Sequence, residues 1–320
     1  MTRRPTDVAD LVARTRSGDS RAVARLISLV ENDSPLLQEV AAALGPHAGH
    51  AQVVGLTGAP GVGKSTSTSA LVTALRADGK RIGVLAVDPS SPFSGGALLG
   101  DRVRMQEHAT DDGVFIRSMA SRGQLGGLSA AVPQALRVLD AAGCDIVLVE
   151  TVGVGQAEVE IASVADTTVL VLAPGMGDGI QAAKAGIIEI ADVFVVNKAD
   201  RDGADQVARD LRYMQSLGGR HSAAGSWRPP IVKTVASRAE GIDDLVVALD
   251  KHRSWMDAHG ELSARRRARA ASEIEAIAVG EVRQRFTQVH GSAALDAAAE
   301  RVVAGETDPY TAAGELIARL

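Results

Sequence analysis

Seven short runs rich in Val and Ile lie between residues 51 and 235, and segments with helical spacing of apolar residues separate them. Within a run, polar and apolar positions do not alternate, which is typical of strands buried on both faces. Such strands, joined by helices, predict an α/β fold with a mainly parallel, helix-covered sheet. The predicted strands are Val53–Thr57, Ile82–Val87, Val114–Met119, Asp145–Glu150, Thr167–Leu172, Val193–Asn197 and Ile231–Val235.

Both ends of the chain show helical patterns instead. Before residue 51, apolar residues recur three and four positions apart, and Gly18-Asp19-Ser20 predicts a break followed by a helix cap. Beyond residue 241, one amphipathic helix runs from Ile242 through Met256, and an apolar stripe from Ile274 to Phe286 marks another. We expect this stripe to be a dimer contact, because an arm outside the α/β domain has little of its own to pack on. The expected parts are a helical extension over 1–50, an α/β domain over 51–255 and a helical arm over 256–320.

Composition narrows the class of protein. A hydrophobic share of 46% is ordinary for a globular chain of 320 residues. The net charge of −5 argues against nucleic acid as the main partner, since phosphate binding needs a basic surface. The single cysteine, Cys144, excludes an internal disulfide and fits a reducing cytosol. We see no targeting signal and no apolar run near the roughly 20 residues of a membrane span. We therefore expect a cytoplasmic protein without a membrane partner.

A glycine-rich loop between the first predicted strand and the next helix fits the pattern G-x-x-x-x-G-K-S, which is typical of P-loop NTPases. Glycines let the backbone curl so that N–H groups face an anion, and the helix amino terminus adds free donors and the positive end of a dipole. Lys64 can reach the β- and γ-phosphates, and Ser65 can ligate Mg²⁺. The residues predicted to bind nucleotide here are Gly58, Ala59, Pro60, Gly61, Val62, Gly63, Lys64, Ser65 and Thr66.

A second motif, Asn197-Lys198-Ala199-Asp200, comes at the end of the sixth predicted strand. The carboxylate of Asp200 can accept hydrogen bonds from guanine N1–H and the exocyclic amine. Adenine offers an acceptor and a C–H there, so the carboxylate would lose its partners. We expect Asn197 to brace the loop and face the other edge of guanine, and the stem of Lys198 to cover the base. Ala236-Ser237, after the last strand, can supply a backbone N–H to guanine O6, and we assign this to Ser237.

Acidic residues stand at the ends of two predicted strands. Asp88 follows the second strand and Glu150 ends the fourth, where a carboxylate can hold Mg²⁺ directly or through water. Asp101 is a further candidate, and Gly153 can bring a backbone N–H to the γ-phosphate. The predicted metal ligands are Ser65, Asp88, Asp101 and Glu150.

The residue after Gly153 is Val154, whereas small GTPases have a water-positioning Gln there. The nearest glutamine, Gln156, comes two residues later. We therefore expect slow intrinsic GTP hydrolysis, with a partner completing the site.

Longer stretches of the sequence resemble the methylmalonyl-CoA mutase-associated GTPase chaperones of the MeaB/ArgK type. Residues 88–105 resemble the first switch of that family, 150–156 the second and 174–186 the third, and 18–31 are similar to its amino-terminal helix. Together these stretches extend over roughly residues 17–250. The resemblance implies a P-loop GTPase of the SIMIBI class.

The resemblance also implies a homodimer that uses GTP to gate transfer of adenosylcobalamin into methylmalonyl-CoA mutase and to protect that enzyme. By position, Asp88, Asp101 and Glu150 match acids around the family's Mg²⁺ and switches, while Arg104 and Lys184 match its mobile charged residues. Arg104 or Lys184 can neutralise developing charge during in-line attack by water, and a salt bridge that holds a switch closed explains them equally. The predicted catalytic residues are Lys64, Glu150, Gly153, Arg104 and Lys184.

Two other functions compete with this interpretation. A nickel-insertion GTPase of the same structural class would want a His-rich tail or a Cys/His metal pair, which the sequence lacks. A kinase acting on a transport protein, a label attached to the same family, needs an acceptor cleft and a base, and we find no motif for either. Asp257-Ala258-His259 begins a cobalamin-ligand pattern, D-x-H-x-x-G, but Leu262 stands where the glycine is required. We therefore expect no cobalamin site on this chain.

Overall fold

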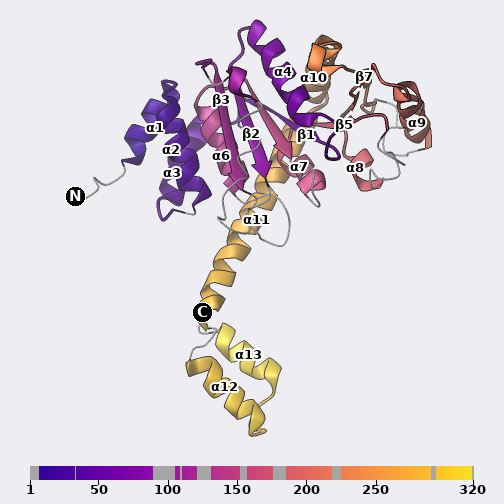
Figure 1. Cartoon of the computed structure of the whole chain (residues 1–320). Coiled ribbons are helices and arrows are strands. Elements are labelled where there is room, and N and C mark those ends of the chain that lie inside the picture. The colour runs from indigo at the N-terminus through magenta and orange to yellow at the C-terminus, as the bar shows by residue number, and fades with distance from the viewer. Residues whose placement is uncertain are drawn as a thin grey trace. The chain divides into compact units, whose positions relative to one another are not determined.

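A parallel sheet organises the chain. The computed structural model describes residues 7–32, 34–88, 105–108, 110–120, 131–151, 157–175, 185–217, 225–289 and 293–318. Within these residues, seven strands form one sheet in the order β3-β2-β4-β1-β5-β6-β7, and all neighbours are parallel (Figure 1). Each predicted run forms a strand, which confirms the α/β class. The bounds are β1 Gln52–Thr57, β2 Ile82–Asp88, β3 Val114–Ala120, β4 Ile146–Thr151, β5 Thr167–Leu172, β6 Val193–Val196 and β7 Ile231–Lys233.

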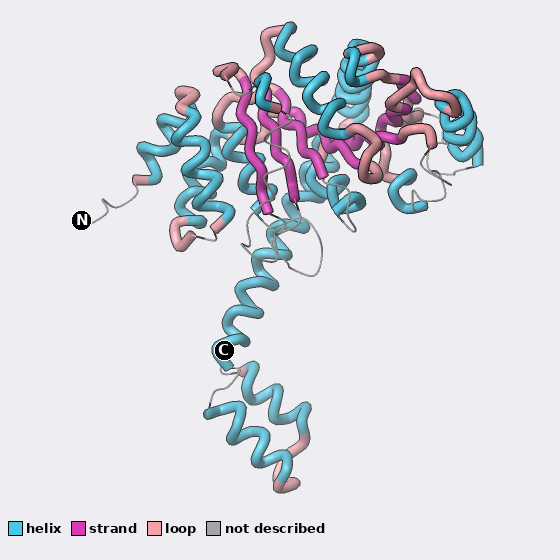
Figure 2. The backbone as a smooth tube through the Cα atoms, viewed as in Figure 1, coloured by secondary structure: helices cyan, strands magenta, loops and turns pink. Residues whose placement is uncertain are grey.

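Helices cover both faces of the sheet (Figure 2). Val84 and Leu85, neighbours on β2, are both fully buried, but they join different core clusters. Val84 packs with residues of α4 and α10, and Leu85 with residues of α6. Because neighbouring side chains of a strand point to opposite faces, two covered faces require apolar residues at every position. These helices are α4 Lys64–Ala77, α6 Ala131–Ala141 and α10 Ile242–His259.

Three amino-terminal helices pack on the α6 side of the sheet. Leu26 and Ile27 of α2, with Val40 of α3, belong to the same core cluster as α6. The segment before β1 therefore shares its core with the sheet. The remaining helices of this part are α1 Val8–Arg16, α2 Ser20–Glu31, α3 Leu37–Leu44, α7 Ala157–Val164, α8 Ala185–Glu189 and α9 Ala204–Leu217, with 3₁₀ turns η1 Gly45–His47, η2 Gln106–His108 and η3 Ala236–Arg238.

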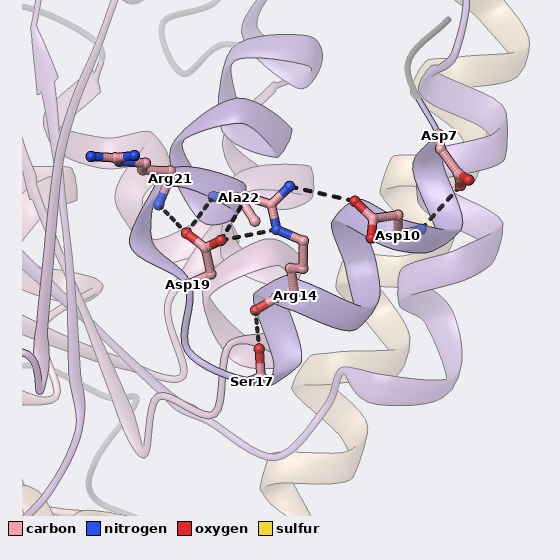
Figure 3. A network of polar contacts seen from close by, with 7 residues as sticks. All are labelled: Asp7, Asp10, Arg14, Ser17, Asp19, Arg21 and Ala22. Atoms are coloured by element: carbon pink, nitrogen blue, oxygen red, sulfur yellow. Dashed lines mark hydrogen bonds and ion pairs between the residues drawn. The ribbon is translucent and has the colours of Figure 1, made fainter. Parts of the chain in front are cut away.

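Asp19 is the N-cap of α2, at the break that the sequence predicts (Figure 3). Its Oδ1 accepts hydrogen bonds from the backbone N–H groups of Arg21 at 2.8 Å and Ala22 at 3.2 Å. Its Oδ2 accepts from Nε and Nη2 of Arg14, near the end of α1, at 2.9 and 2.6 Å. This paired guanidinium, together with the backbone donors, holds the pKa of Asp19 below its ordinary value. One carboxylate thus caps α2 and ties α1 to it.

The chain divides into two compact units, Met1–Leu262 and Ser263–Leu320. The second contains most of α11 Glu261–Val289, then α12 Ala293–Val303 and α13 Pro309–Ile317. Asp308 caps α13 by accepting from the N–H groups of Tyr310 and Thr311 at 2.9 and 3.1 Å. The three-part division expected from the sequence remains a prediction. Among the described helices, none has the length and apolar character needed to cross a membrane.

Candidate functional site

The glycine-rich loop joins β1 to α4 in a backbone conformation that favours glycine. The φ angle is 141° at Gly58, 78° at Gly61 and 96° at Gly63. Two of these positions also lack room for a side chain. A Cβ at Gly58 would collide with the carbonyl oxygen of Val171 on β5, and one at Gly63 with the amide nitrogen of Asn197. The curl of the loop therefore depends on glycine at these positions.

Lys64, the first residue of α4, holds its ammonium group inside the loop. Nζ donates hydrogen bonds to the carbonyl oxygens of Gly58 at 2.6 Å and Ala59 at 3.1 Å, and the residue is buried. A cation at this place, beside the amino terminus of a helix, makes the loop attractive to phosphate. This placement supports the predicted role of Lys64 at the β- and γ-phosphates.

Ser65 and Glu150 meet beside the loop, although 85 positions separate them in the sequence. Ser65 Oγ donates to Glu150 Oε1 at 2.5 Å, and Thr68 Oγ1, one turn further along α4, lies 3.1 Å from Oε2. All three residues are buried. Glu150 lies on β4 beside Leu56 of β1, which places its carboxylate next to the start of the loop. The result is a buried group of oxygen atoms, the kind of ligand that Mg²⁺ prefers.

Asn197 braces the loop that follows β6, as predicted. Its Nδ2 donates to the carbonyl oxygen of Val62 at 2.9 Å. Its Oδ1 accepts from Thr234 Oγ1 at 3.2 Å and from the N–H of Ala236 at 3.1 Å. One buried amide therefore joins the glycine-rich loop (residues 58–65, the predicted phosphate loop), the loop after β6 and the loop after β7. The contact of Asn197 with a guanine edge remains a prediction.

Lys198 and Ser237 flank the place where the sequence puts the base. Lys198 has a φ of 55°, and its Nζ donates to the carbonyl oxygen of Gly61 at 2.6 Å. The side chain thus reaches from the loop after β6 (residues 197–200, the predicted base loop) to the phosphate loop. Ser237 is exposed on η3, and within the described part of the chain its backbone N–H donates no hydrogen bond. That N–H is available to a carbonyl such as guanine O6.

Asp200 is half exposed and lies near a cation that the sequence interpretation missed. Its Oδ2 is 3.6 Å from Nη2 of Arg238, whose side chain also pairs with Glu240 at 2.9 Å. An exposed ion pair of this kind contributes little stability. The carboxylate of Asp200 can therefore exchange this partner for the N–H groups of a base.

Several predicted site residues lie outside the described residues. These are Asp101, Arg104, Gly153 and Lys184, together with most of the three switch-like segments. Asp88 ends β2 as predicted, but only its backbone is described. Thr68 is a residue near the phosphate loop that the sequence interpretation did not select. Its position three residues after Ser65 was the available signal, because such residues share a helix face.

The fold and this site define a class of protein. A parallel sheet with a glycine-rich loop after β1, followed by a lysine and a hydroxyl at the start of a helix, is that of a P-loop NTPase. Residues 23–290 match the family described as methylmalonyl Co-A mutase-associated GTPase MeaB. Because this match extends over most of the chain, the protein belongs to that family, and the family resemblance seen in the sequence is confirmed.

Individual relatives carry related names. A Pyrococcus abyssi protein provisionally named as a GTPase is 47% identical over 310 residues, 97% of this chain and 96% of its own. The GTPase ArgK of Escherichia coli is 37% identical over 261 residues, 80% of this chain and 78% of its own. The mitochondrial methylmalonic aciduria type A homolog of Mus musculus is 41% identical over 214 residues, 67% of this chain and 52% of its own.

A solved structure supports the fold. The crystal structure of LAO/AO transport system kinase has a TM-score of 0.72 and 27% identity, and the match covers 99% of this chain and 98% of that one. No group of three or more His, Cys, Asp or Glu side chains that could hold a metal ion occurs among the residues that the structure describes.

Proposed function

We propose that this protein binds GTP with Mg²⁺, hydrolyses it slowly to GDP and phosphate, and uses this cycle in the cytoplasm to gate adenosylcobalamin loading and protection of methylmalonyl-CoA mutase. The observation that carries the nucleotide assignment is the 2.9 Å hydrogen bond from Asn197 to the Val62 carbonyl. It joins the base loop to the phosphate loop, so that one ligand can contact both. The family match supports the mutase as the partner.

Guanine selection rests on the carboxylate of Asp200. When the base enters, the N1–H and exocyclic amine of guanine take the place of Arg238, while the N–H of Ser237 meets O6. Adenine would leave the carboxylate without donors and would face the Ser237 N–H with its own amine. The stem of Lys198, held by its bond to Gly61, covers the ring.

The oxygen group beside the loop fits Mg²⁺. Ser65 and Glu150 hold their oxygens 2.5 Å apart in a buried place next to Lys64. In the proposed site, these two residues with Asp88 and Asp101 hold the cation directly or through water. When bound, Mg²⁺ neutralises negative charge on the β- and γ-phosphate oxygens.

Hydrolysis is an in-line attack of water on the γ-phosphorus, with the bond to the β-phosphate oxygen breaking as GDP leaves. Lys64 and the loop amides hold the phosphates through this step. The N–H of Gly153 meets a γ-phosphate oxygen, and Arg104 or Lys184 neutralises developing charge. Since no Gln follows Gly153 directly, water is poorly oriented and the intrinsic rate is low.

The apolar stripe on α11 supports a homodimer. Ile274 is 68% exposed, and Ile277 and Val282 are each 51% exposed. Apolar side chains at this spacing lie on one side of the helix, where a second protein surface would remove them from water. A second copy of the chain presents the same stripe and pairs with it by two-fold symmetry.

The base assignment is tested by Asp200→Asn. An asparagine amide donates where the aspartate accepts, so it suits xanthine, which carries a carbonyl in place of the exocyclic amine. We expect the unaltered protein to bind GTP well above ATP, and Asp200→Asn to lose GTP by roughly a hundredfold and gain xanthosine triphosphate. Equal binding of ATP and GTP by the unaltered protein would contradict the proposal.

The partner is tested by a pull-down with methylmalonyl-CoA mutase, with the GTPase rate measured with and without it. We expect binding and a faster rate. Labelled GTP in the same mixture separates the kinase alternative, because a kinase leaves the γ-phosphate on a protein and a GTPase releases it to water. No binding and no rate change would remove the chaperone role and leave the nucleotide site intact.

A further inference from the structure

The carboxylate of Glu150 is held at both of its oxygens by one face of α4. Ser65 Oγ donates to Oε1 at 2.5 Å, and Thr68 Oγ1 is 3.1 Å from Oε2. Thr68 has an exposed fraction of 0% and Glu150 of 1%. The two hydroxyls come from positions three residues apart on one helix, which brings them to the same side. The arrangement is therefore a two-point support rather than a single contact.

The hydroxyl of Thr68 has one proton and two acceptors within reach. The second acceptor is the carbonyl oxygen of Lys64, four residues earlier, at 3.0 Å. A hydrogen bond to an ionised carboxylate is roughly twice as strong as one to a neutral carbonyl, so the proton belongs with Glu150.

Two hydrogen bonds fix the orientation of the Glu150 carboxylate, which a single hydrogen bond does not. The last torsion of a glutamate side chain is broad, so a carboxylate held by one hydrogen bond at Oε1 can still rock about its Cγ–Cδ bond within the tolerance of that hydrogen bond. Thr68 removes this freedom by holding Oε2. In a buried site, a carboxylate of fixed orientation binds a cation more tightly than one that must first be ordered.

We propose that Thr68 is a positioning residue of the cation site. It fixes the rotation of the Glu150 carboxylate and so keeps Oε1 and the Ser65 hydroxyl ready for the cation that accompanies the nucleotide. The inference rests on the proposed function, since it needs Mg²⁺ and a guanine nucleotide to share this site. Thr68 acts through Glu150 and takes no direct part in holding the phosphates.

The test measures how much Mg²⁺ tightens the binding of a fluorescent GDP analogue, comparing excess MgCl₂ with EDTA. Thr68→Val keeps the shape of the side chain and removes the hydroxyl, and Thr68→Ser restores it. The matched control is Thr73→Val on the same helix, where the hydroxyl donates to the Ser69 carbonyl at 3.1 Å. Thermal melting of each variant shows whether it is folded.

We expect Thr68→Val to bind the analogue in EDTA within twofold of the unaltered protein, because Lys64 and the loop are intact. With MgCl₂, its gain in affinity should be roughly tenfold smaller than that of the unaltered protein, since supports of metal ligands typically have effects of this size. Thr68→Ser and Thr73→Val should keep the full gain. A folded Thr68→Val with an unchanged gain, or with equal losses in both buffers, would overturn the inference.

The unaltered protein distinguishes this failure from that of the proposed function. If it does not bind the GDP analogue in either buffer, the nucleotide assignment is wrong, and the role of Thr68 is wrong with it. If it binds the analogue equally well with and without Mg²⁺, the cation site at Ser65 and Glu150 is refuted, while guanine binding stands.

Discussion

The side-chain amide of Asn197 occupies the space in which a Cβ of Gly63 would lie. Their contact is the place where the base loop closes on the phosphate loop, and the hydrogen bond from Asn197 to the adjacent Val62 carbonyl secures it. The absence of a side chain at Gly63 thus serves the backbone conformation and the approach of a second loop at once.

Gly63→Ala should therefore weaken nucleotide binding far more than it weakens the fold. The new methyl group would push Asn197 away, and the φ of 96° would be strained for alanine. We expect GDP affinity to fall by roughly tenfold or more, measured by equilibrium binding. The matched control is Gly79→Ala, with a φ of 76° but no atom within 4 Å of the added methyl. Equal affinities for the two variants would contradict the role of the Asn197 contact.

Acid should reduce the stabilising effect of the Asp19–Arg14 pair. Because the pKa of Asp19 is lowered from 3.8 in the folded protein, its stabilising effect is complete above that value. The effect is lost as the pH falls through the lower, folded-state pKa. Asp19→Asn keeps an oxygen for the cap but has no charge for Arg14. We expect it to melt at a lower temperature than the unaltered protein at pH 7, with the difference shrinking below about pH 4.

Asp10→Asn is the control for this pH effect. Asp10 also faces Arg14, at 3.4 Å, but both side chains are about half exposed and Asp10 caps no helix. We expect a melting temperature close to that of the unaltered protein at pH 7. A melting difference for Asp19→Asn that stays constant from pH 7 to pH 3 would refute the contribution of its charge.

A buried histidine on α10 should be a strong determinant of stability. His252 has no exposed surface; its Nδ1 lies 2.9 Å from Thr167 Oγ1, and its Nε2 lies 3.4 Å from Asp192 Oδ1. His252→Leu deprives a buried carboxylate and a buried hydroxyl of this partner, and we expect a loss of about 2–4 kcal/mol in the free energy of unfolding. The chain has two tryptophans, Trp227 and Trp255, and their ring centroids lie 4.8 and 6.1 Å from that of His252. Urea unfolding followed by tryptophan fluorescence therefore measures the change.

The control is His259→Leu, because His259 stacks on Trp255 at 4.8 Å but is exposed. Its effect on the free energy of unfolding should stay within about 0.5 kcal/mol. Similar losses of unfolding free energy for both variants would show that the buried polar contacts of His252 do not stabilise the fold.

Cys144 should be unreactive in the folded protein. Burial raises the pKa of its thiol to about 12, so at pH 8 only about one molecule in ten thousand carries the thiolate. Since it is the single cysteine, labelling by a chromogenic disulfide reagent reports on this site alone. We expect labelling to be slow in buffer and to follow the unfolding curve in urea. Rapid, stoichiometric labelling without urea would contradict the burial of this side chain.

The sheet could be predicted from the sequence because strands buried on both faces consist of runs rich in Val and Ile. The ends of the helices and strands depend on local contacts, which these runs do not reveal. Helix α4 begins at Lys64 because the left-handed Gly63 ends the loop directly before it. Strand β7 ends at Lys233 rather than at Val235, which instead pairs with Glu240.

The phosphate loop could be predicted because the residues of its motif are consecutive in the sequence. The partnership of Thr68 with Glu150 could not, since 82 positions separate them and only the stacking of α4 on β4 brings them together. The same holds for Arg238, which reaches Asp200 through the turn after β7. Asp101, Arg104, Gly153 and Lys184 remain predictions from the sequence.

Because a single amide at Asn197 serves three loops, the energies of holding the two ends of a nucleotide are not independent. A substitution in the base loop will also weaken the contacts of the phosphate loop, and the reverse holds as well. The losses of binding free energy caused by one substitution in each loop will therefore not add up in the double variant. In the proposed site, the nucleoside and the triphosphate are thus recognised as a single cooperative unit.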